Sequence, residues 1–184
     1  GARVEANAQN HPNACAIIFE DQELTWFEFN ALANRFAHYL QEQGVKRGDV
    51  VSIMMKNRIE YVALLVGLNK LGAVSGLLNS NLSGNSLVHC INVTGSSKCI
   101  VGEECMTELD AVQDQLQLQA GSDFFFVTDD GSRPCPNWAQ DLMASSTDAS
   151  QDNPSQTNDT TIGETALYIY TSGTTGLPKA AVLS

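Results

Sequence analysis

The chain has few basic residues and no long apolar run. Its 184 residues contain 10 Lys and Arg against 21 Asp and Glu, which gives a formal net charge of −11. This charge argues against a nucleic-acid partner, because phosphate backbones are held by basic surfaces. No segment approaches the roughly 18 consecutive apolar residues of a membrane-spanning helix, and no signal-peptide pattern is present. We therefore expect neither a transmembrane nor a signal segment within these residues.

Cysteine and histidine are also sparse, and their spacing excludes the common metal sites. The five cysteines form no CxxC pair, and the three histidines show no metal-ligand spacing and adjoin no nucleophile motif. The scattered cysteines, odd in number, predict free thiols in a reducing compartment. We expect no metal-binding residues, a structural role for His89 and a surface or boundary position for His38. The cysteines are Cys15, Cys90, Cys99, Cys105 and Cys135.

Apolar runs that alternate with helix-like segments predict an α/β fold. The runs are continuous, as expected for strands of a sheet that is covered on both faces. Strand–helix–strand units imply a mainly parallel sheet with right-handed crossovers. Strands are expected at residues 50–55, 73–78, 99–101 and 124–127, and helices at residues 59–71, 85–93 and 104–119.

Particular residues mark the ends of the predicted helices. Thr25 and Glu28 have the spacing of a capping box, so a helix is expected to start after Thr25. Gly44 is suited to end that helix, and residues 20–23 are expected to form a hairpin turn before it. Asn57 is expected to cap the next helix. The apolar residues of that helix point in nearly all directions, which predicts that it is deeply packed.

Residues 145–164 differ from the rest of the chain in being rich in Ser, Thr, Asp, Asn and Gln, with almost no apolar residue. A stretch of this length without regular structure is unusual inside a compact domain. We interpret it as a polar surface connector that leads the chain to its last strands. A disordered acidic linker is the alternative interpretation.

Residues 165–184 predict a strand, a phosphate-binding loop and a second strand. Gly173 and Gly176 allow the backbone to approach a ligand closely, and successive N–H groups in such a turn can form an anion-binding nest. Lys179 supplies a compact positive charge for phosphate oxygens. Four hydroxyl side chains lie between these features, those of Thr171, Ser172, Thr174 and Thr175.

This loop is not a Walker A motif, because Pro178 precedes Lys179 and Ala180 follows it. The simpler interpretation is a surface hairpin, since Ser, Thr and Gly favour turns without any ligand. The ordered combination of an apolar strand, a loop rich in hydroxyl groups and a Pro-Lys pair favours the phosphate-binding interpretation.

The string Tyr-Thr-Ser-Gly-Thr-Thr-Gly-Leu-Pro-Lys at residues 170–179 resembles the signature loop of the adenylate-forming superfamily. That superfamily includes acyl-CoA synthetases, luciferases and peptide-synthetase adenylation domains. The resemblance implies that the loop holds the phosphates of ATP during formation of an acyl-AMP, with Lys179 stabilising charge on the departing pyrophosphate. The implied ATP-binding residues are Tyr170, Thr171, Ser172, Gly173, Thr174, Thr175, Gly176 and Lys179.

Residues around the loop resemble one branch of this superfamily, the fatty acid transport proteins and very-long-chain acyl-CoA synthetases. The resemblance lies in Ala180-Ala181-Val182 after Lys179, and upstream in residues 78–82 and 87–90. It implies that residues 1–184 are the N-terminal part of an adenylation domain, from a fatty acid–CoA ligase that uses ATP, Mg²⁺ and coenzyme A. A cytoplasmic-face location, membrane association through segments outside these residues, and a homo-oligomer are further expectations.

The resemblance also implies that these residues alone are inactive. The superfamily's adenine-binding Tyr-Gly-x-Thr-Glu motif, ribose-binding Asp and C-terminal lysine are not among them. Two alternatives stay open at this point. One is a non-enzymatic module that binds a nucleotide or a partner, and the other is an adenylating enzyme for a different carboxylic acid.

Overall fold

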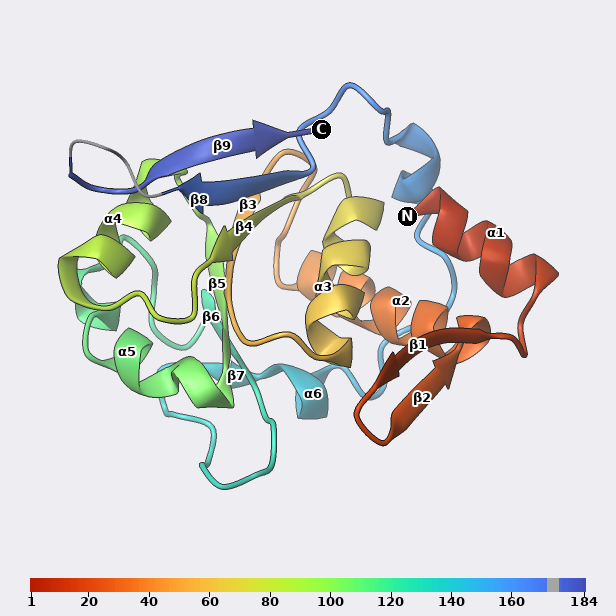
Figure 1. Ribbon diagram of the computed structural model, residues 1–184, viewed down its shortest axis with the longest axis horizontal. Helices are drawn as coiled ribbons and strands as arrows, with labels where there is room; N and C mark the ends of the chain where they lie inside the picture. Colours follow the sequence, from red (N-terminus) through yellow and green to blue (C-terminus); the bar gives the residue numbers. More distant parts are fainter. Residues whose placement is uncertain (172–175) are drawn as a thin grey trace.

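The computed structural model describes residues 1–171 and 176–184, which form a mixed sheet with helices on both faces and a separate small hairpin (Figure 1). The large sheet has seven strands in the order β7-β6-β5-β3-β4-β8-β9. Every neighbouring pair is parallel except β8 and β9, which are antiparallel. The α/β fold with a mainly parallel sheet, predicted from the alternation of apolar runs, is therefore confirmed.

The described strands are β1 (Cys15–Phe19), β2 (Gln22–Thr25), β3 (Val50–Met54), β4 (Val74–Leu78), β5 (Lys98–Gly102), β6 (Phe124–Val127), β7 (Gln140–Asp141), β8 (Leu167–Thr171) and β9 (Lys179–Leu183). The α-helices are α1 (Ala2–Asn10), α2 (Trp26–Glu42), α3 (Ile59–Lys70), α4 (Gly84–Val93), α5 (Met106–Asp110) and α6 (Leu142–Ser145). Short 3-10 helices are η1 (Glu103–Cys105), η2 (Gln113–Gln115) and η3 (Ser155–Asp159).

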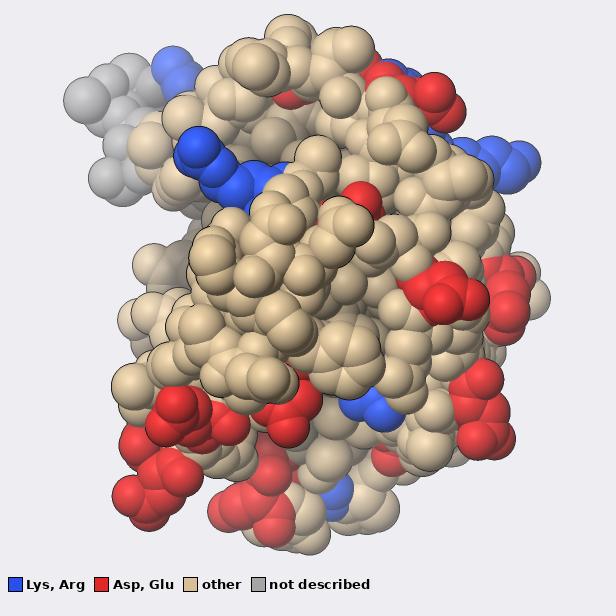
Figure 2. All heavy atoms as spheres, turned by 90° about the vertical axis from the view of Figure 1, so that its right-hand side faces the viewer, with Lys and Arg blue, Asp and Glu red and all other residues tan. Residues whose placement is uncertain are grey.

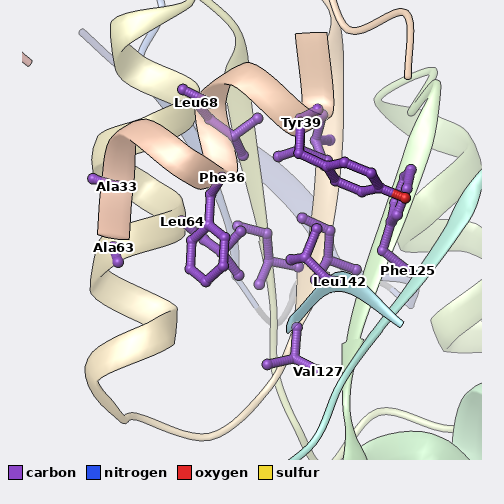
Figure 3. Close-up of a cluster of buried hydrophobic side chains, with 14 of the residues drawn as sticks. Ala33, Phe36, Tyr39, Ala63, Leu64, Leu68, Phe125, Val127 and Leu142 are labelled. Atoms are coloured by element: carbon purple, nitrogen blue, oxygen red, sulfur yellow. The ribbon is translucent and has the colours of Figure 1, made fainter. Parts of the chain in front are cut away.

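The sheet separates two hydrophobic cores, and strand β6 contributes to both. Its successive side chains point to opposite faces, so Phe125 packs with α2, α3 and α6, whereas Phe124 and Phe126 pack with α4 and α5. Figure 3 shows the first core, where Phe36 of α2 and Leu64 of α3 lie side by side. All five of these side chains are almost completely buried, which explains why the apolar runs are continuous rather than alternating.

Helices α2 and α3 approach each other closely at Gly67. A Cβ atom at this position would lie 2.8 Å from the backbone oxygen of Ala33. Such a distance leaves no room for a side chain, so a glycine is needed where the two helices cross. The close contact places the end of α3 against the middle of α2.

The predicted ends of α2 are confirmed. Thr25 is the N-cap, its side chain accepts a hydrogen bond from the backbone N–H of Glu28, and the Glu28 carboxylate accepts one from the N–H of Thr25. This reciprocal pair is the capping box that the sequence predicts. Gly44 follows the helix with a φ of +90°, a conformation in which glycine is favoured.

Three helix predictions are wrong or incomplete. The N-cap of α3 is Arg58 rather than Asn57, without a side-chain cap bond, because the Arg58 side chain extends into an acidic cluster described below. Residues 104–119 do not form one helix but η1, α5 and η2. α5 ends at Asp110, whose carboxylate accepts a hydrogen bond of 2.6 Å from the Trp138 indole. In α3 the residues are buried or half-buried except Val62, which is 36% exposed, so the predicted deep packing holds except at that position.

Residues 145–164 pass over the helices on the α2–α3 face, and a buried lysine fastens them there. The Lys70 side chain is completely buried, and its Nζ atom lies 2.6 Å from the side-chain oxygens of both Asn30 and Asn34. The same atom lies 3.1 Å from Glu5 Oε1 and 3.3 Å from Asn153 Oδ1. The lysine thus joins α1, α2 and α3 to the polar segment.

Acidic side chains predominate on the face that carries α1 and the β1–β2 hairpin, where Figure 2 shows several separate clusters of Asp and Glu and few basic groups. This distribution agrees with the net charge of −11. No helix among the described residues is long and apolar enough to cross a membrane.

Candidate functional site

The carboxyl ends of the parallel strands meet at one edge of the sheet, where the sequence predicts the phosphate-binding loop. The chain leaves β3 into α3 on one face and leaves the neighbouring strand β4 into α4 on the other. Adjacent connections that diverge in this way create the crevice in which open α/β sheets bind ligands. Strand β8 pairs in parallel with β4, so Thr171 at the carboxyl end of β8 lies at the same edge.

The two arms of this loop are the end of β8 and the start of β9. Thr171 stands directly opposite Lys179 in the antiparallel register, and its hydroxyl donates a long hydrogen bond of 3.5 Å to the Lys179 carbonyl. Gly176 has a φ of +136°, which a side chain would strain. Thr171, Gly176 and Lys179 are all exposed. The structure therefore brings these three predicted residues together, with polar groups open to an incoming anion.

Four other predicted binding residues lie outside the described part of the chain. They are Ser172, Gly173, Thr174 and Thr175.

Tyr170 faces away from Thr171 and Lys179. Successive strand residues point to opposite sides, and the Tyr170 ring packs with the core on the α4 face. Its hydroxyl shares a hydrogen bond of 3.0 Å with Thr94 Oγ1, and burial raises the pKa of this phenol. From Thr94 the polar contacts continue to Ser96 at 3.3 Å and on to Ser52 at 2.6 Å. The Tyr170 hydroxyl thus bonds a residue at the end of α4.

His89, for which the sequence predicts a structural role, contacts the second arm of the loop. Its Nε2 atom lies 3.1 Å from the carbonyl oxygen of Pro178, the residue before Lys179. Helix α4 also packs against β9, as Figure 1 shows. His38 instead lies on α2, with its Nε2 atom 2.9 Å from the backbone oxygen of Asp152. Its side chain is thus tied to the polar segment that follows α6.

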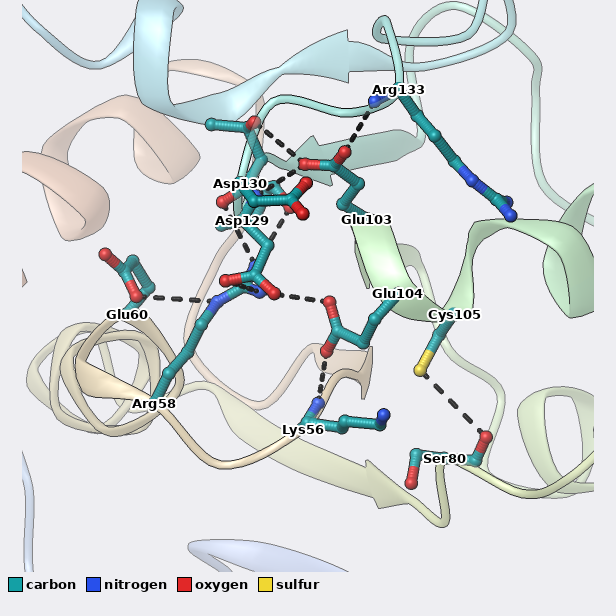
Figure 4. A network of polar contacts seen from close by, with 12 residues as sticks. Lys56, Arg58, Glu60, Ser80, Glu103, Glu104, Cys105, Asp129, Asp130 and Arg133 are labelled. Atoms are coloured by element: carbon teal, nitrogen blue, oxygen red, sulfur yellow. Dashed lines mark hydrogen bonds and ion pairs between the residues drawn. The ribbon is translucent and has the colours of Figure 1, made fainter. Parts of the chain in front are cut away.

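A second polar group at the same edge is centred on Arg58, which is only 7% exposed (Figure 4). Its guanidinium donates to the carbonyl oxygens of Val127 at 2.9 Å and Thr128 at 3.2 Å. It also pairs with the carboxylates of Glu104 at 3.0 Å and Asp129 at 3.2 Å. This cation is already surrounded by carboxylates and carbonyls, so it connects the ends of β3, β5 and β6 rather than offering charge to a ligand.

Glu103 arranges the loop that follows β6. Its carboxylate accepts hydrogen bonds from the backbone N–H groups of Asp129 at 2.7 Å, Gly131 at 3.1 Å and Arg133 at 2.6 Å. The hydroxyls of Thr128 and Ser132 donate two more. Loss of water acts to raise the pKa of Glu103, but these donors outweigh it and lower that pKa to about 2. Glu103 therefore remains charged and fully engaged at neutral pH.

Sequence reasoning missed both Arg58 and Glu103. A signal was available, because Glu103 and Glu104 follow directly after an apolar strand, where the carboxyl ends of parallel strands collect polar groups. Their partners at residues 127–133 could not be read from the sequence, because they come from a different strand.

Free thiols are confirmed for all five cysteines. Burial raises the pKa of Cys99 to about 12, and burial followed by the nearby Glu104 and Glu108 carboxylates does the same for Cys105. Both are therefore held as neutral thiols, unsuited to act as nucleophiles. Within residues 1–171 and 176–184, no group of three or more His, Cys, Asp or Glu side chains is placed to hold a metal ion.

Solved structures with this arrangement define the class of protein. A Mycobacterium tuberculosis fatty acyl CoA synthetase aligns over 97% of this chain and 33% of its own, with a TM-score of 0.76 and 26% identity. The anthranilate CoA ligase AuaEII, solved with anthranoyl-AMP, aligns with a TM-score of 0.84 over 97% of this chain and 34% of its own, at 21% identity. The fold is thus that of the N-terminal part of acyl-CoA synthetases, as the resemblance of the loop implies.

Sequence comparison then gives the family. The model of the AMP-binding enzymes matches residues 4–184, and the chain belongs to this family. Long-chain fatty acid transport protein 6 from Mus musculus is 34% identical over 180 residues, covering 97% of this chain and 28% of that protein. The medium/long-chain-fatty-acid–CoA ligase FadD6 of Mycobacterium tuberculosis is 31% identical over 184 residues, or 29% of its length. The chain therefore spans less than a third of these relatives.

Proposed function

We propose that this chain is the N-terminal adenylation part of a fatty acid–CoA ligase, in which residues 170–179 hold the phosphates of ATP. The observation that supports this most is the place of Thr171, Gly176 and Lys179 together at the carboxyl edge of the sheet. That edge is where folds of this type bind ligands, and the chain belongs to the AMP-binding enzymes.

In this reaction an oxygen of the fatty acid carboxylate attacks the α-phosphorus of ATP. The bond from that phosphorus to the oxygen bridging to the β-phosphate breaks, which yields acyl-AMP and pyrophosphate. Lys179 offsets the negative charge that develops on the pyrophosphate, and the Thr171 hydroxyl and loop N–H groups add donors. The acyl group is then transferred to the thiol of coenzyme A, which releases AMP.

Among the proposed binding residues, Tyr170 has a different task from the others. Its hydroxyl is engaged with Thr94 on the α4 face, opposite Thr171 and Lys179. We assign it to holding the first arm of the loop. Ser172, Gly173, Thr174, Thr175 and Gly176 complete the proposed contacts to the phosphates, as the loop sequence suggests.

The proposal includes Mg²⁺, which enters bound to the triphosphate. Among residues 1–171 and 176–184 there is no cluster of three or more His, Cys, Asp or Glu side chains that could hold the ion. Mg²⁺ in nucleotide enzymes is commonly held by substrate phosphates, waters and one or two carboxylates, so this arrangement needs no dedicated protein cage at the loop.

A fatty acid is the proposed acid substrate because the named relatives are fatty acid transport proteins and a medium/long-chain-fatty-acid–CoA ligase. AuaEII, an anthranilate CoA ligase, has the same fold, so an aromatic acid is the competing substrate class. We further propose a location at the cytoplasmic face, with membrane association through segments outside these residues.

The substrate class is tested by ATP–pyrophosphate exchange in the intact protein that carries these residues. Exchange that requires a long-chain fatty acid supports the proposal, because each buried CH₂ group of such a chain contributes about 0.8 kcal/mol to binding. Exchange with benzoate or anthranilate and none with fatty acids would replace the substrate class. The isolated chain of 184 residues is expected to show no exchange.

A non-enzymatic association module is the second candidate, and the edge of the sheet favours it. Among the described residues β9 lies at the edge of the sheet, and Val182 and Leu183 on it are 62% and 45% exposed. Exposed apolar edge strands promote pairing with another chain, which also agrees with the proposed homo-oligomer. Sedimentation of the isolated chain as a monomer at all concentrations would count against this candidate.

A further inference from the structure

We propose that helix α4 and its C-cap hold the two arms of the predicted phosphate-binding loop, at Tyr170 and at Pro178, with His89 and Thr94 as positioning residues for Lys179. The inference rests on the proposed function, because it assigns these two residues to the geometry of the same phosphate site. Neither residue belongs to the loop sequence, and neither is among the proposed contacts to ATP.

The first arm of the loop needs support because the parallel pairing of β8 with β4 ends before Tyr170. The register of β4 with β8 runs from Ser75 opposite Leu167 to Leu77 opposite Ile169. Tyr170 is the next residue and lies beyond this ladder, paired only with β9. The hydrogen bond of 3.0 Å between its hydroxyl and Thr94 ties this end of β8 to the C-cap of α4.

Thr94 is itself fixed by several contacts. Its Oγ1 atom lies 3.4 Å from the Cys90 carbonyl and 3.3 Å from Ser96 Oγ, and Ser96 in turn contacts Ser52 of the central strand β3 at 2.6 Å. Tyr170 is therefore connected through three hydroxyls to the middle of the sheet. A series of hydrogen bonds of this kind fixes the start of the loop relative to the rigid strand β3.

The second arm depends on His89. Among the described residues β9 pairs in the sheet with β8, and α4 packs against β9 as well. His89 Nε2 lies 3.1 Å from the Pro178 carbonyl, one residue before Lys179. Because a carbonyl oxygen only accepts, Nε2 must carry the proton, and this holds for the neutral Nε2–H tautomer and for the imidazolium alike.

The two hydrogen bonds come from α4 and its C-cap and end on the two arms of the loop. Tyr170 is the first residue of the loop, and Pro178 precedes Lys179 by one residue. Fixing these two points sets the distance between the two arms and the direction in which the Lys179 side chain points from β9. Displacement of a binding group by about 1 Å can cost as much as 100-fold in rate, so losing either bond should lower turnover without unfolding the protein.

The test uses His89 variants of the intact protein, assayed by fatty-acid-dependent ATP–pyrophosphate exchange. His89→Ala removes the donor and should lower kcat/KM for ATP by about 10- to 100-fold. In His89→Gln the amide nitrogen takes roughly the place of Nε2 and should restore most of the rate. His89→Asn places its amide nitrogen near the position of Nδ1 instead and should not. If the Ala variant does not fold, the Gln and Asn pair carries the same comparison.

A double-mutant cycle with Lys179→Ala separates the inference from the proposed function. If His89 acts through Lys179, the effect of His89→Ala should shrink to about twofold or less when Lys179 is already alanine, because coupled residues are not additive. An undiminished effect in that background overturns the positioning role. So does full activity of His89→Ala when Lys179→Ala is impaired. Full activity of Lys179→Ala instead overturns the proposed function of the loop.

Thr94 provides an independent check on the first arm. Thr94→Val keeps the shape but removes the hydroxyl that bonds Tyr170, and kcat/KM should fall by about three- to tenfold. Thr94→Ser retains the hydroxyl and should stay near the unchanged protein. Equal rates for the Val and Ser variants would show that the contact to Tyr170 does not position the loop.

Discussion

Lys70 and Lys179 carry the same side chain in opposite surroundings. Lys70 ends α3 and is completely buried, with three asparagine oxygens and the Glu5 carboxylate around its ammonium group. Lys179 begins β9 at the carboxyl edge of the sheet and is exposed. The first has its hydrogen-bonding capacity filled by the protein, whereas the second faces solvent beside Thr171 and Gly176. We therefore assign Lys70 to stability and Lys179 to ligand binding.

Burial has a measurable consequence at Lys70. Desolvation lowers the pKa of this amine, and the hydrogen bond and charge of Glu5 partly restore it. Oriented oxygens from α1, α2 and the polar segment thus offset the desolvation cost of the buried ammonium group. Removing one of these oxygens should therefore lower the stability of the folded state. Lys179 is exposed, so a substitution there should change stability little.

The largest expected effect is on activity and comes from Lys179→Ala. Loss of a preorganised group that stabilises developing charge lowers kcat by about 10²–10³-fold. The intact protein should show this loss in fatty-acid-dependent ATP–pyrophosphate exchange, while the unfolding free energy changes by less than about 0.5 kcal/mol. Lys46→Ala, at another exposed lysine, serves as the control and should leave both quantities unchanged. Equal activity of the two variants would remove Lys179 from the site.

Lys70→Met should show the reverse pattern, with stability lost first. Removing the ammonium leaves the half-buried Glu5 without its cation, although the Thr157 hydroxyl still donates to it. The two asparagine oxygens of α2 also lose the Lys70 donor. Together these losses should cost about 3 kcal/mol in unfolding free energy. Chemical denaturation monitored by circular dichroism measures this change, with Lys46→Met as the matched exposed control. A loss of less than about 0.5 kcal/mol would mean that the buried cluster is not a stabilising element.

Glu103→Gln should lower stability by about 2 kcal/mol at pH 7, because five donors lose a charged acceptor. The effect depends on pH in a defined direction. The pKa of Glu103 is lowered from 4.5 to about 2 on folding, so its contribution is present above pH 4.5 and disappears as the pH falls from 4.5 to 2. Unfolding curves of the two proteins should therefore converge in acid. A difference that stays constant over that range would contradict this account.

Asn153→Ala is expected to have the smallest effect, about 1 kcal/mol. Its side-chain oxygen contacts Lys70 and the side-chain amides of Asn30 and Asn34, so its loss should free residues 151–157 rather than unfold the domain. Hydrogen exchange should become faster in that segment and stay unchanged in β3. Asn158→Ala, at a nearby exposed position, is the control.

The sequence predicts those features that depend on neighbours along the chain. Thr25 and Glu28 lie three residues apart, so their capping box is readable, and the apolar run at residues 124–127 is readable as a covered strand. The two strands that flank the predicted phosphate-binding loop, β8 and β9, are readable for the same reason. Features that join segments distant in the sequence cannot be predicted in this way. The carboxylate of Glu103 meets residues 128–133, and Lys70 meets Asn153, only after the sheet and helices have formed.

The helix predicted at residues 104–119 shows the same limit. Leu109, Val112 and Leu116 have helical spacing, and all three are buried in the α4-face core. The chain nevertheless breaks into short turns, because Asp110 bonds Trp138 and Glu103 bonds the loop after β6. The helical spacing of these three residues agrees with their burial, while tertiary hydrogen bonds decide the backbone conformation.

The most direct test of the central claim is to identify the products of a single turnover by the intact protein, supplied with a long-chain fatty acid and ATP but no coenzyme A. The account predicts acyl-AMP and pyrophosphate in equal amounts, formed much more slowly by Lys179→Ala than by Lys46→Ala. Release of ADP and phosphate, or acyl-AMP formation at the same rate in both variants, would contradict it.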